Sequence, residues 1–399
     1  LDFFDKYEFK NLYNKILMNQ KKSTLTDKDK QSKKIEDPIQ PATLTSSEIL
    51  LRSYKLVNNK ETFHQLMEEL SSQDIFSFSL LPSQPNSDKS FPIGISFSTT
   101  PYKASFIPLI ENNLVNLTTD KIIKELRPLL ASEKKMKVTY DLKSKWTLRE
   151  YLNLPIHENI FDIMIASHLL NPDLDHSFVK LCENLLQTSK TTEEDLLTSK
   201  ENRNLSQVDI DLLTYHCGEE SDLTLRIYEK ISTQLKKEEL HTLFSSIEMP
   251  LIPILAKMEQ TGFLIDKEKL KNLSAQIQSQ CKILEQEIHG LSGETFNISS
   301  PKQLQEIIFT KLKIHEKLGL QKLKKTKTGY STDVTALESL REEPIIQKII
   351  NYRKLTKLKS TYTDALPQLI EFKSGRIHTT FQQTGTATGR LSSIKPNLQ

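Results

Sequence analysis

The chain has 399 residues, including 54 Lys or Arg and 51 Asp or Glu, with a formal net charge of +3. This length exceeds one ordinary hydrophobic core, so the sequence predicts two or three domains. No apolar run is long enough to cross a bilayer, so we expect no membrane association. The chain begins with Leu1, and its charged and aromatic opening residues show no signal peptide, so we expect a cut or processed N-terminus.

The spacing of the cysteines and the distribution of charge indicate which kinds of site and partner to expect. Cys182, Cys217 and Cys281 form no C-x-x-C pair, and their odd number argues against a complete disulfide framework. We interpret them as buried thiols in a reducing cytoplasm. Residues 246–399 contain 23 basic and 15 acidic side chains, whereas residues 1–245 contain 31 and 36. The basic C-terminal part favours a polyanionic partner, although a solvated surface would also carry such charge.

Taken in chain order, residues 21–46 are rich in Lys, Ser, Thr and Asp and predict a linker. Residues 1–20 would then belong to something upstream. Between residues 47 and 235 strands and helices alternate, which indicates an α/β domain. The predicted strands are 74–81, 93–98 and 103–109, and the predicted helices are 119–131, 159–170 and 219–235.

From about residue 245 the pattern becomes helical. Five apolar residues, spaced as on one helix face, predict a first helix that ends at Gly262. They are Ile247, Leu251, Ile254, Leu255 and Met258. Asp266 is expected to cap a second helix that Gly290 closes, and the two helices would form an antiparallel arm. Ser300, Pro301 and Gln303 predict a capped helix start, and another helix should follow Pro344.

Common catalytic signatures are absent: the sequence has no phosphate-binding glycine loop, no G-x-S-x-G and no H-E-x-x-H. His168 and His216 are interpreted as packed or exposed helix residues. Glu219, Glu220 and Asp222 could bind a metal, but a solvated helix face is the favoured interpretation.

Two basic segments point to phosphate binding. Lysines 322, 324, 325 and 327 fall in a predicted loop. Arg353 and Lys357 lie one helical turn apart, and Thr361 and Tyr362 follow them with hydroxyl groups. Such side chains suit phosphate oxygens and groove edges, although a charged helix surface alone would explain this segment.

The terminal stretch TATGRLSSIKPNLQ, Thr386 to Gln399, resembles the thumb-to-palm junction of bacterial DNA polymerase I, a family A DNA polymerase. The resemblance extends back through IEMPLIPILAKMEQTGFLID and FNISSPKQLQ, and more weakly through the α/β region. It implies a ribonuclease H-like exonuclease-type α/β domain, followed by a helical thumb and the first strands of a polymerase palm. The implied domains are the end of a 5′-nuclease region (1–20), a linker (21–46), the exonuclease-like domain (47–235), the thumb (246–364) and a truncated palm (365–399).

The resemblance also implies site residues. Arg390 would reach the minor-groove acceptors that all base pairs share, and Gly389 would allow close backbone approach. Asn397 and Gln399 match amides placed at the duplex. In the thumb, Arg353, Lys357, Thr361 and Tyr362 match the segment that holds the duplex.

By contrast, Glu220 is the only acid left at the matched exonuclease positions. Where an active domain carries D-x-E this chain has Ser79 and Leu81, and Lys145 falls at the next aspartate. His216 and Glu220 fall at the final tyrosine and aspartate, with Tyr215 one place out of register. We therefore predict no proofreading and no bound metal.

The polymerase strings D-Y-S-Q-I-E-L-R and H-D-E do not occur in this sequence either. The catalytic carboxylates, Mg²⁺ and deoxynucleoside triphosphates would belong to a complete polymerase, a monomer of the bacterial cytoplasm and nucleoid that acts in replication and repair. We predict that this segment binds primer–template DNA without catalysis. Two alternatives remain: a non-catalytic basic nucleic-acid-binding module, and an active 3′–5′ exonuclease with an unusual metal site.

Overall fold

The computed structural model describes residues 52–85, 90–109, 118–156, 158–197, 204–320, 324–326 and 329–399. The predicted nuclease end and linker (1–46), together with Lys322 and Lys327, lie outside the described residues. The chain divides into two compact units. The first runs to Met258 and includes Gln382–Ser392, and the second comprises Glu259–Phe381 and Ser393–Gln399. In the described parts, no helix combines the length and apolarity needed to span a membrane.

A six-stranded mixed sheet forms the centre of the first unit, in the order β1-β4-β3-β2-β5-β6. Strands β2, β3 and β4 are antiparallel neighbours, whereas β1 on β4, and β5 on β2 and β6, pair in parallel. The strands are β1 (Ser53–Leu56), β2 (Ile75–Pro82), β3 (Pro92–Thr100), β4 (Lys103–Pro108), β5 (Met136–Thr139) and β6 (Ile160–Asp162). The three predicted strands are β2, β3 and β4.

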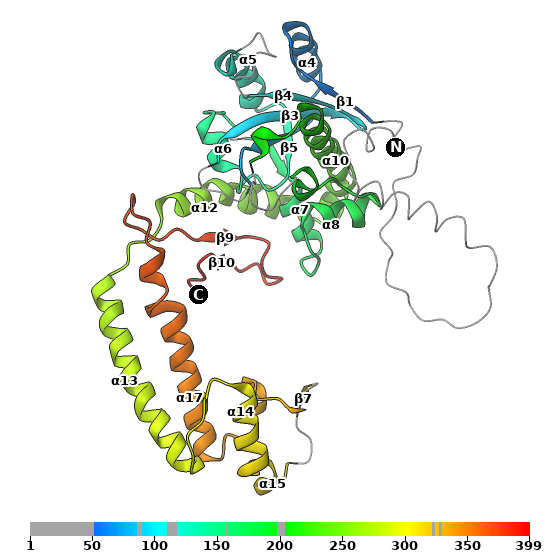
Figure 1. Cartoon of the computed structure of the whole chain (residues 1–399). Coiled ribbons are helices and arrows are strands. Elements are labelled where there is room, and N and C mark those ends of the chain that lie inside the picture. Colours follow the sequence, from blue (N-terminus) through cyan, green and yellow to red (C-terminus); the bar gives the residue numbers. More distant parts are fainter. Residues whose placement is uncertain are drawn as a thin grey trace, which may run out of the picture. The chain divides into compact units, whose positions relative to one another are not determined.

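Helices cover both faces of this sheet, and α10 packs across its strands on one face (Figure 1). The helices and helical turns are α4 (Lys60–Ser72), α5 (Thr119–Ala131), α6 (Trp146–Tyr151), α7 (Ile163–Leu170), α8 (Phe178–Leu181), η1 (Cys182–Leu186), α9 (Glu193–Leu196), η2 (Leu205–Gln207), α10 (Ile210–Lys237), α11 (His241–Leu243) and η3 (Phe244–Glu248). The helices predicted at 119–131 and 219–235 are confirmed. The helix predicted at 159–170 is wrong at its start, because β6 occupies Ile160–Asp162 and Asp162 caps α7.

The two faces of β2 differ in chemistry, as its alternating sequence requires. Phe76, Phe78 and Leu80 join the large apolar core. Ser77 and Ser79 point the other way and are buried too, because α10 covers them. The Ser77 hydroxyl donates to the Ser221 carbonyl of α10 at 2.6 Å. Serines on a covered face need such partners, since an unpaired buried hydroxyl is costly.

Helix α12 (Met249–Thr261) ends before Gly262, as predicted, and Gly262 has φ +66°. Its predicted apolar stripe is confirmed at Leu255 but wrong at three of its five residues. Ile247, Ile254 and Met258 are exposed, whereas Ile252, Leu255 and Ala256 are buried. Apolar residues surround much of this helix, so spacing alone did not identify which ones would be covered.

The second unit contains two long helices that pack side by side, α13 (Lys267–Ser292) and α17 (Pro344–Leu358) (Figure 1). The predicted pairing of the first two helices into an arm is therefore corrected: the partner of α13 is α17, about fifty residues later in the chain. The other elements are α14 (Pro301–Gln305), η4 (Glu306–Lys311), α15 (Ile314–Lys317), β7 (Lys325–Thr326), β8 (Gly329–Tyr330), α16 (Val334–Glu338), η5 (Lys359–Thr363) and η6 (Leu366–Leu369).

The helix starts of this unit follow the predicted caps. The Asp266 carboxylate accepts from the Lys269 N–H at 3.0 Å, and the Ser300 hydroxyl accepts from the Gln303 N–H at 3.5 Å. Gln303 does not close a capping box on Ser300, because its side-chain oxygen accepts from the Asn297 N–H at 2.7 Å. The helix predicted after Pro344 is α17. The predicted lysine loop is a short hairpin in its described part, where β7 pairs with β8.

The last segment supplies short strands, β9 (Thr380–Gln382) and β10 (Ser392–Ile394), which pair with each other. Just before them, Ile377 forms an isolated bridge with Phe263 and is buried. The predicted palm strands are therefore present.

At the C-terminus of α13 the structure corrects the predicted helix end, and this correction can be tested. Gly290 lies inside the helix, and a Cβ there would meet nothing within 4 Å. Gly293 is the cap, with φ +76°. Gly290→Ala should therefore raise the free energy of unfolding of this unit by about 0.5–1 kcal/mol, because alanine loses less backbone entropy in a helix.

Gly293→Ala is the matched control and should destabilise, because alanine is strained at positive φ. Urea unfolding followed by far-ultraviolet circular dichroism measures both variants. Fluorescence of the single tryptophan, Trp146, reports on the first unit and should not change. Destabilisation by Gly290→Ala would contradict this description of the helix end.

Candidate nucleic-acid interface

Three of the predicted exonuclease positions meet in the first unit. Glu220 lies in α10, Ser79 on the α10-facing side of β2, and Lys145 at the N-cap of α6. The Lys145 ammonium donates to Glu220 Oε1 at 2.6 Å and to the Ser79 hydroxyl at 2.7 Å. Ser79 in turn donates to the same carboxylate oxygen at 2.7 Å.

A second cation, which the sequence analysis missed, completes this cluster. Lys190 Nζ lies 3.4 Å from Glu220 Oε2 and 4.8 Å from the centroid of the Phe178 ring. Burial alone would raise the pKa of Glu220, but the two lysines hold it well below its usual value. Lys190 comes from an irregular stretch between η1 and α9, so no periodic signal in the sequence places it there.

This arrangement does not fit a catalytic metal. Both carboxylate oxygens of Glu220 already face ammonium groups, and a further cation would be repelled. In the ranges that the structure describes, no group of three or more His, Cys, Asp or Glu side chains could hold a metal ion.

The other two predicted exonuclease positions, Leu81 and His216, add no charge to the cluster around Glu220. Leu81 belongs to an apolar cluster with Leu213 and Cys217. His216 is fully covered, and burial, followed by the charge of Lys190, lowers its pKa to about 3. His216 is therefore neutral near pH 7 and adds no charge to the cluster.

The neighbouring acids of α10 overturn the solvated-face interpretation, because Glu219 and Asp222 are 1% and 0% exposed. Glu219 pairs with Arg52 and accepts from the Thr191 N–H at 2.7 Å. Asp222 accepts from the Tyr54 hydroxyl at 2.8 Å and from the Tyr102 N–H at 2.6 Å. These acids are thus compensated inside the fold.

In the second unit, a hollow of about 1230 Å³ forms beside α14 and α17 and is rich in donors. Its basic residues are Lys302, Arg353 and Lys357, and its hydroxyl residues are Ser299, Ser300, Thr310, Tyr330, Ser331, Thr332, Thr356 and Ser360. Of its two acids, Asp333 pairs with Lys324 at 2.6 Å and Glu306 lies 3.9 Å from Lys311. The hollow therefore offers a net positive, hydroxyl-lined surface.

The structure brings two of the predicted thumb residues into this hollow. Arg353 is half-buried and donates through Nη1 to the Thr332 carbonyl, so part of its guanidinium holds the chain itself. Lys357, in the last turn of α17, is exposed. Thr361 and Tyr362 lie in η5, outside the lining. Lys302 and the Ser300 hydroxyl were missed as binding groups, because the sequence presented that segment only as a helix start.

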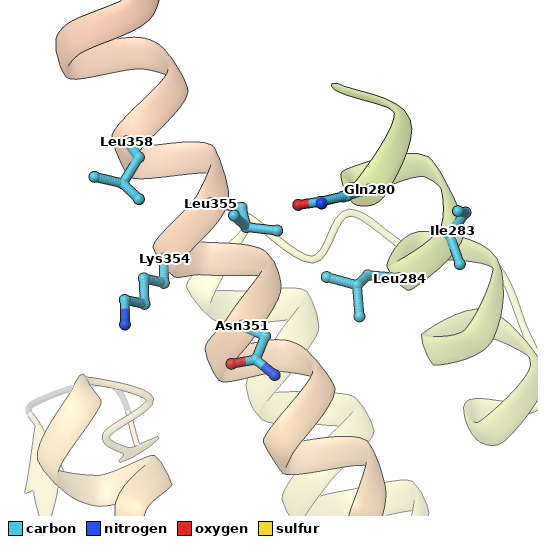
Figure 2. Close-up of a pocket in the computed structure, with 7 residues that line it drawn as sticks. All are labelled: Gln280, Ile283, Leu284, Asn351, Lys354, Leu355 and Leu358. Carbon is cyan, nitrogen blue, oxygen red and sulfur yellow. The ribbon is translucent and has the colours of Figure 1, made fainter. Parts of the chain in front are cut away.

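A second, smaller hollow of about 440 Å³ lies between α13 and α17 and is mainly apolar (Figure 2). Ile283 and Leu284 line it from α13, and Leu355 and Leu358 from α17. Leu284 and Leu355 point toward each other across it (Figure 2). Lys354 lines this hollow and not the hydroxyl-rich one. Neighbouring lysines of one helix thus line two chemically different surfaces.

The terminal motif is divided between the units. Arg390 is exposed and belongs to the first, where the Thr386 hydroxyl donates to its carbonyl at 2.7 Å. Asn397 and Gln399 are exposed in the second, where the Tyr362 hydroxyl donates to the Gln399 carbonyl. Gly389 has φ +73° and open space around its Cβ position, so its backbone conformation is what requires glycine here.

Two family models match this chain. Residues 267–399 match DNA polymerase family A, and residues 54–236 match the 3′–5′ exonuclease. DNA polymerase I of Borreliella burgdorferi is 33% identical over 347 residues, covering 87% of this chain and 37% of that protein. DNA polymerase I of Pseudomonas aeruginosa is 31% identical over 403 residues, covering 98% of this chain and 42% of that protein. The chain thus spans well under half the length of these relatives.

A solved structure gives the same assignment. It is described as the POL domain of Pol1 from M. smegmatis in complex with DNA primer-template and dNTP, and it is 25% identical with a TM-score of 0.66. The match covers 86% of this chain and 55% of that one. The fold is therefore an exonuclease-like α/β domain followed by a polymerase thumb and the first part of a palm.

The cluster around Glu220 makes a prediction about stability. Glu220→Gln should lower the free energy of unfolding by about 3 kcal/mol at pH 7, because two largely buried lysines lose their counter-charge. The folded-state pKa of Glu220 lies below its usual 4.5, so the stabilisation is present above pH 4.5 and is lost as the pH falls through the folded-state pKa. The wild-type advantage should therefore shrink in acid.

Urea unfolding followed by Trp146 fluorescence at several pH values measures this difference. The matched control is Glu183→Gln, which breaks the more exposed pair of Lys180 and Glu183 and should change stability little. A Glu220→Gln effect as small as the control, or one that grows in acid, would contradict the charge-compensation argument.

Proposed function

Because the chain belongs to DNA polymerase family A, we propose that it is a segment of a DNA-directed DNA polymerase of replication and repair, and that it binds primer–template duplex. The observation that carries the binding proposal is the hydroxyl-rich hollow of the second unit, with three basic residues in its lining. Phosphate oxygens take hydrogen bonds from such side chains irrespective of base sequence. A polymerase needs this property, since it must hold every sequence that it copies.

Arg390 supports a second contact. Its side chain is exposed on a turn that begins at Thr386, so it is available to a partner. Purine N3 and pyrimidine O2 offer acceptors at similar positions in every base pair. An arginine in the minor groove would therefore recognise correct pairing geometry at the primer end. Asn397 and Gln399 would add amide contacts to the same duplex.

We assign polymerisation to the complete protein. The two aspartate-bearing motifs of the family do not occur among these 399 residues, so we propose that the segment alone does not polymerise. In the complete protein, Mg²⁺ held by those carboxylates would align the primer 3′-oxygen with an incoming deoxynucleoside triphosphate. We place the complete protein in the bacterial cytoplasm at the nucleoid, as a monomer.

We propose that the exonuclease-like domain does not proofread. Glu220 alone remains acidic among the five matched positions, and Lys145 and Lys190 compensate its charge. An active exonuclease with an unusual metal site would need to displace both lysines. A purely non-catalytic nucleic-acid module remains the other candidate, and the positive, hydroxyl-lined hollow favours it as a description of the segment by itself.

The binding proposal predicts a salt effect for Lys357. Lys357→Met should weaken duplex binding and lower the slope of log K against log salt by about 1, because one phosphate contact is lost. Lys354→Met is the matched control, with the same substitution on the same helix but at the apolar hollow (Figure 2). Fluorescence anisotropy over a salt series measures both slopes. Equal slopes for the two variants would argue against the hydroxyl-rich hollow as the phosphate site.

The nuclease proposal has a direct assay. The purified chain should release no nucleotides from single-stranded DNA with Mg²⁺ or Mn²⁺, because Lys145 and Lys190 already compensate the charge of Glu220. Denaturing gels of a 5′-labelled strand measure this over hours. Degradation that Glu220→Gln abolishes would overturn the proposal, whereas degradation that survives in Glu220→Gln would indicate a contaminating nuclease.

A further inference from the structure

The turn that carries Arg390 is anchored within the first unit. Residues Gln382–Ser392 belong to the same compact unit as the sheet and α10, although they follow them by more than one hundred residues. Gln383 is 7% exposed, and its side-chain amide donates to both the carbonyl and the carboxylate of Glu248, each at 3.0 Å. Glu248 is the last residue of η3.

A second contact joins the same turn to α7. His168 is 7% exposed, and burial lowers its pKa, while the charge of Glu248 and a hydrogen bond with the backbone of Thr386 raise it. His168 is therefore close to Glu248 and Thr386 at once. The Thr386 hydroxyl in turn donates to the Arg390 carbonyl at 2.7 Å. Polar contacts thus join η3 to Gln383 at the base of the turn and α7 to Thr386, whose hydroxyl contacts the backbone of Arg390.

Contacts within the turn restrict its backbone further. The Ser392 hydroxyl donates to the Gln382 side chain at 3.2 Å and so joins the two ends of the turn. A Cβ at Gly385 would lie 2.3 Å from the Ser392 hydroxyl oxygen. Close packing within the turn and polar contacts at its base therefore fix the backbone that presents Arg390.

From this geometry we infer that Glu248, His168 and Gln383 are positioning residues for Arg390, and that the first unit, which contains the exonuclease-like domain and η3, serves as the platform for minor-groove recognition at the primer end. The inference rests on the proposed function, because it names the residues that would hold Arg390, the proposed minor-groove contact, in place. It gives the domain a role that requires its fold and no metal. Residues that hold a recognition group in place without touching the ligand lower the ordering cost of binding.

The experiment uses the full chain and Gln383→Met, which removes the amide donor and keeps the side-chain length. Amide hydrogen exchange of residues 384–392 should become at least several-fold faster, because the base of the turn is released. Affinity for a primer–template junction should fall about tenfold, the value expected when a charge-assisted hydrogen bond is lost. Affinity for a blunt duplex should change less. Gln234→Met, at an exposed position of α10, is the matched control and should change neither quantity.

The double variant separates positioning from general stability. If Gln383 acts through Arg390, adding Gln383→Met to Arg390→Ala should cost little more affinity than Arg390→Ala alone. Additive losses, or unchanged exchange in Gln383→Met, would overturn the inference. If Arg390→Ala leaves the junction preference intact, the minor-groove role itself fails, and the exchange result alone then decides whether the anchoring contact exists.

Should circular dichroism show that Gln383→Met does not fold, Thr386→Val replaces it. Thr386 is only partly covered, and valine keeps its shape while removing the donor to the Arg390 carbonyl. The same non-additivity with Arg390→Ala is expected. An additive loss in this variant would overturn the inference just as it would in the first.

Discussion

Charge compensation along α10 is the constraint on which the first unit depends. This helix buries Glu219 and Asp222 and covers most of Glu220, whose side chain is 14% exposed, against a sheet face made of serines. Each carboxylate needs a partner from another element, because an isolated buried charge is far more costly than a paired one. Arg52, Lys145, Lys190 and Tyr54 supply those partners, and so the segment before β1, the start of α6 and the stretch after η1 are all fixed against one helix.

The same constraint explains how the domain retains its fold without the acids of an active exonuclease. An acid-rich site without metal would hold repelling carboxylates in a confined space. At the positions that the resemblance matches to three of those acids, this chain has Ser79, Leu81 and Lys145. The charge that metal ions would bring is supplied by side chains, which need no ligand to be present. The polar face of the sheet then becomes a structural interface with α10.

Local signals in the sequence predicted the elements well, whereas partners in space were harder to predict. The alternation of β2, the Asp266 and Ser300 caps and the proline in the first turn of α17 depend on neighbouring residues, and each was recovered. Burial of Glu219 and the approach of Lys190 to Glu220 depend on segments far apart in sequence, and no periodicity encodes them. The end of α13 shows the intermediate case, since Gly290 and Gly293 differ only in φ and the helical spacing does not separate them.

The resemblance of the terminal motif pointed to Arg390, but only the structure shows which residues contact the turn that carries it. In the sequence, His168 and Glu248 lie more than one hundred residues before the turn, and nothing about either residue type indicates a link to it. Their contacts with Gln383 and Thr386 place this turn against η3 and α7. Under the proposed role of Arg390, the contacts of η3 and α7 with that turn constrain their residues, because displacing them moves the backbone from which Arg390 extends.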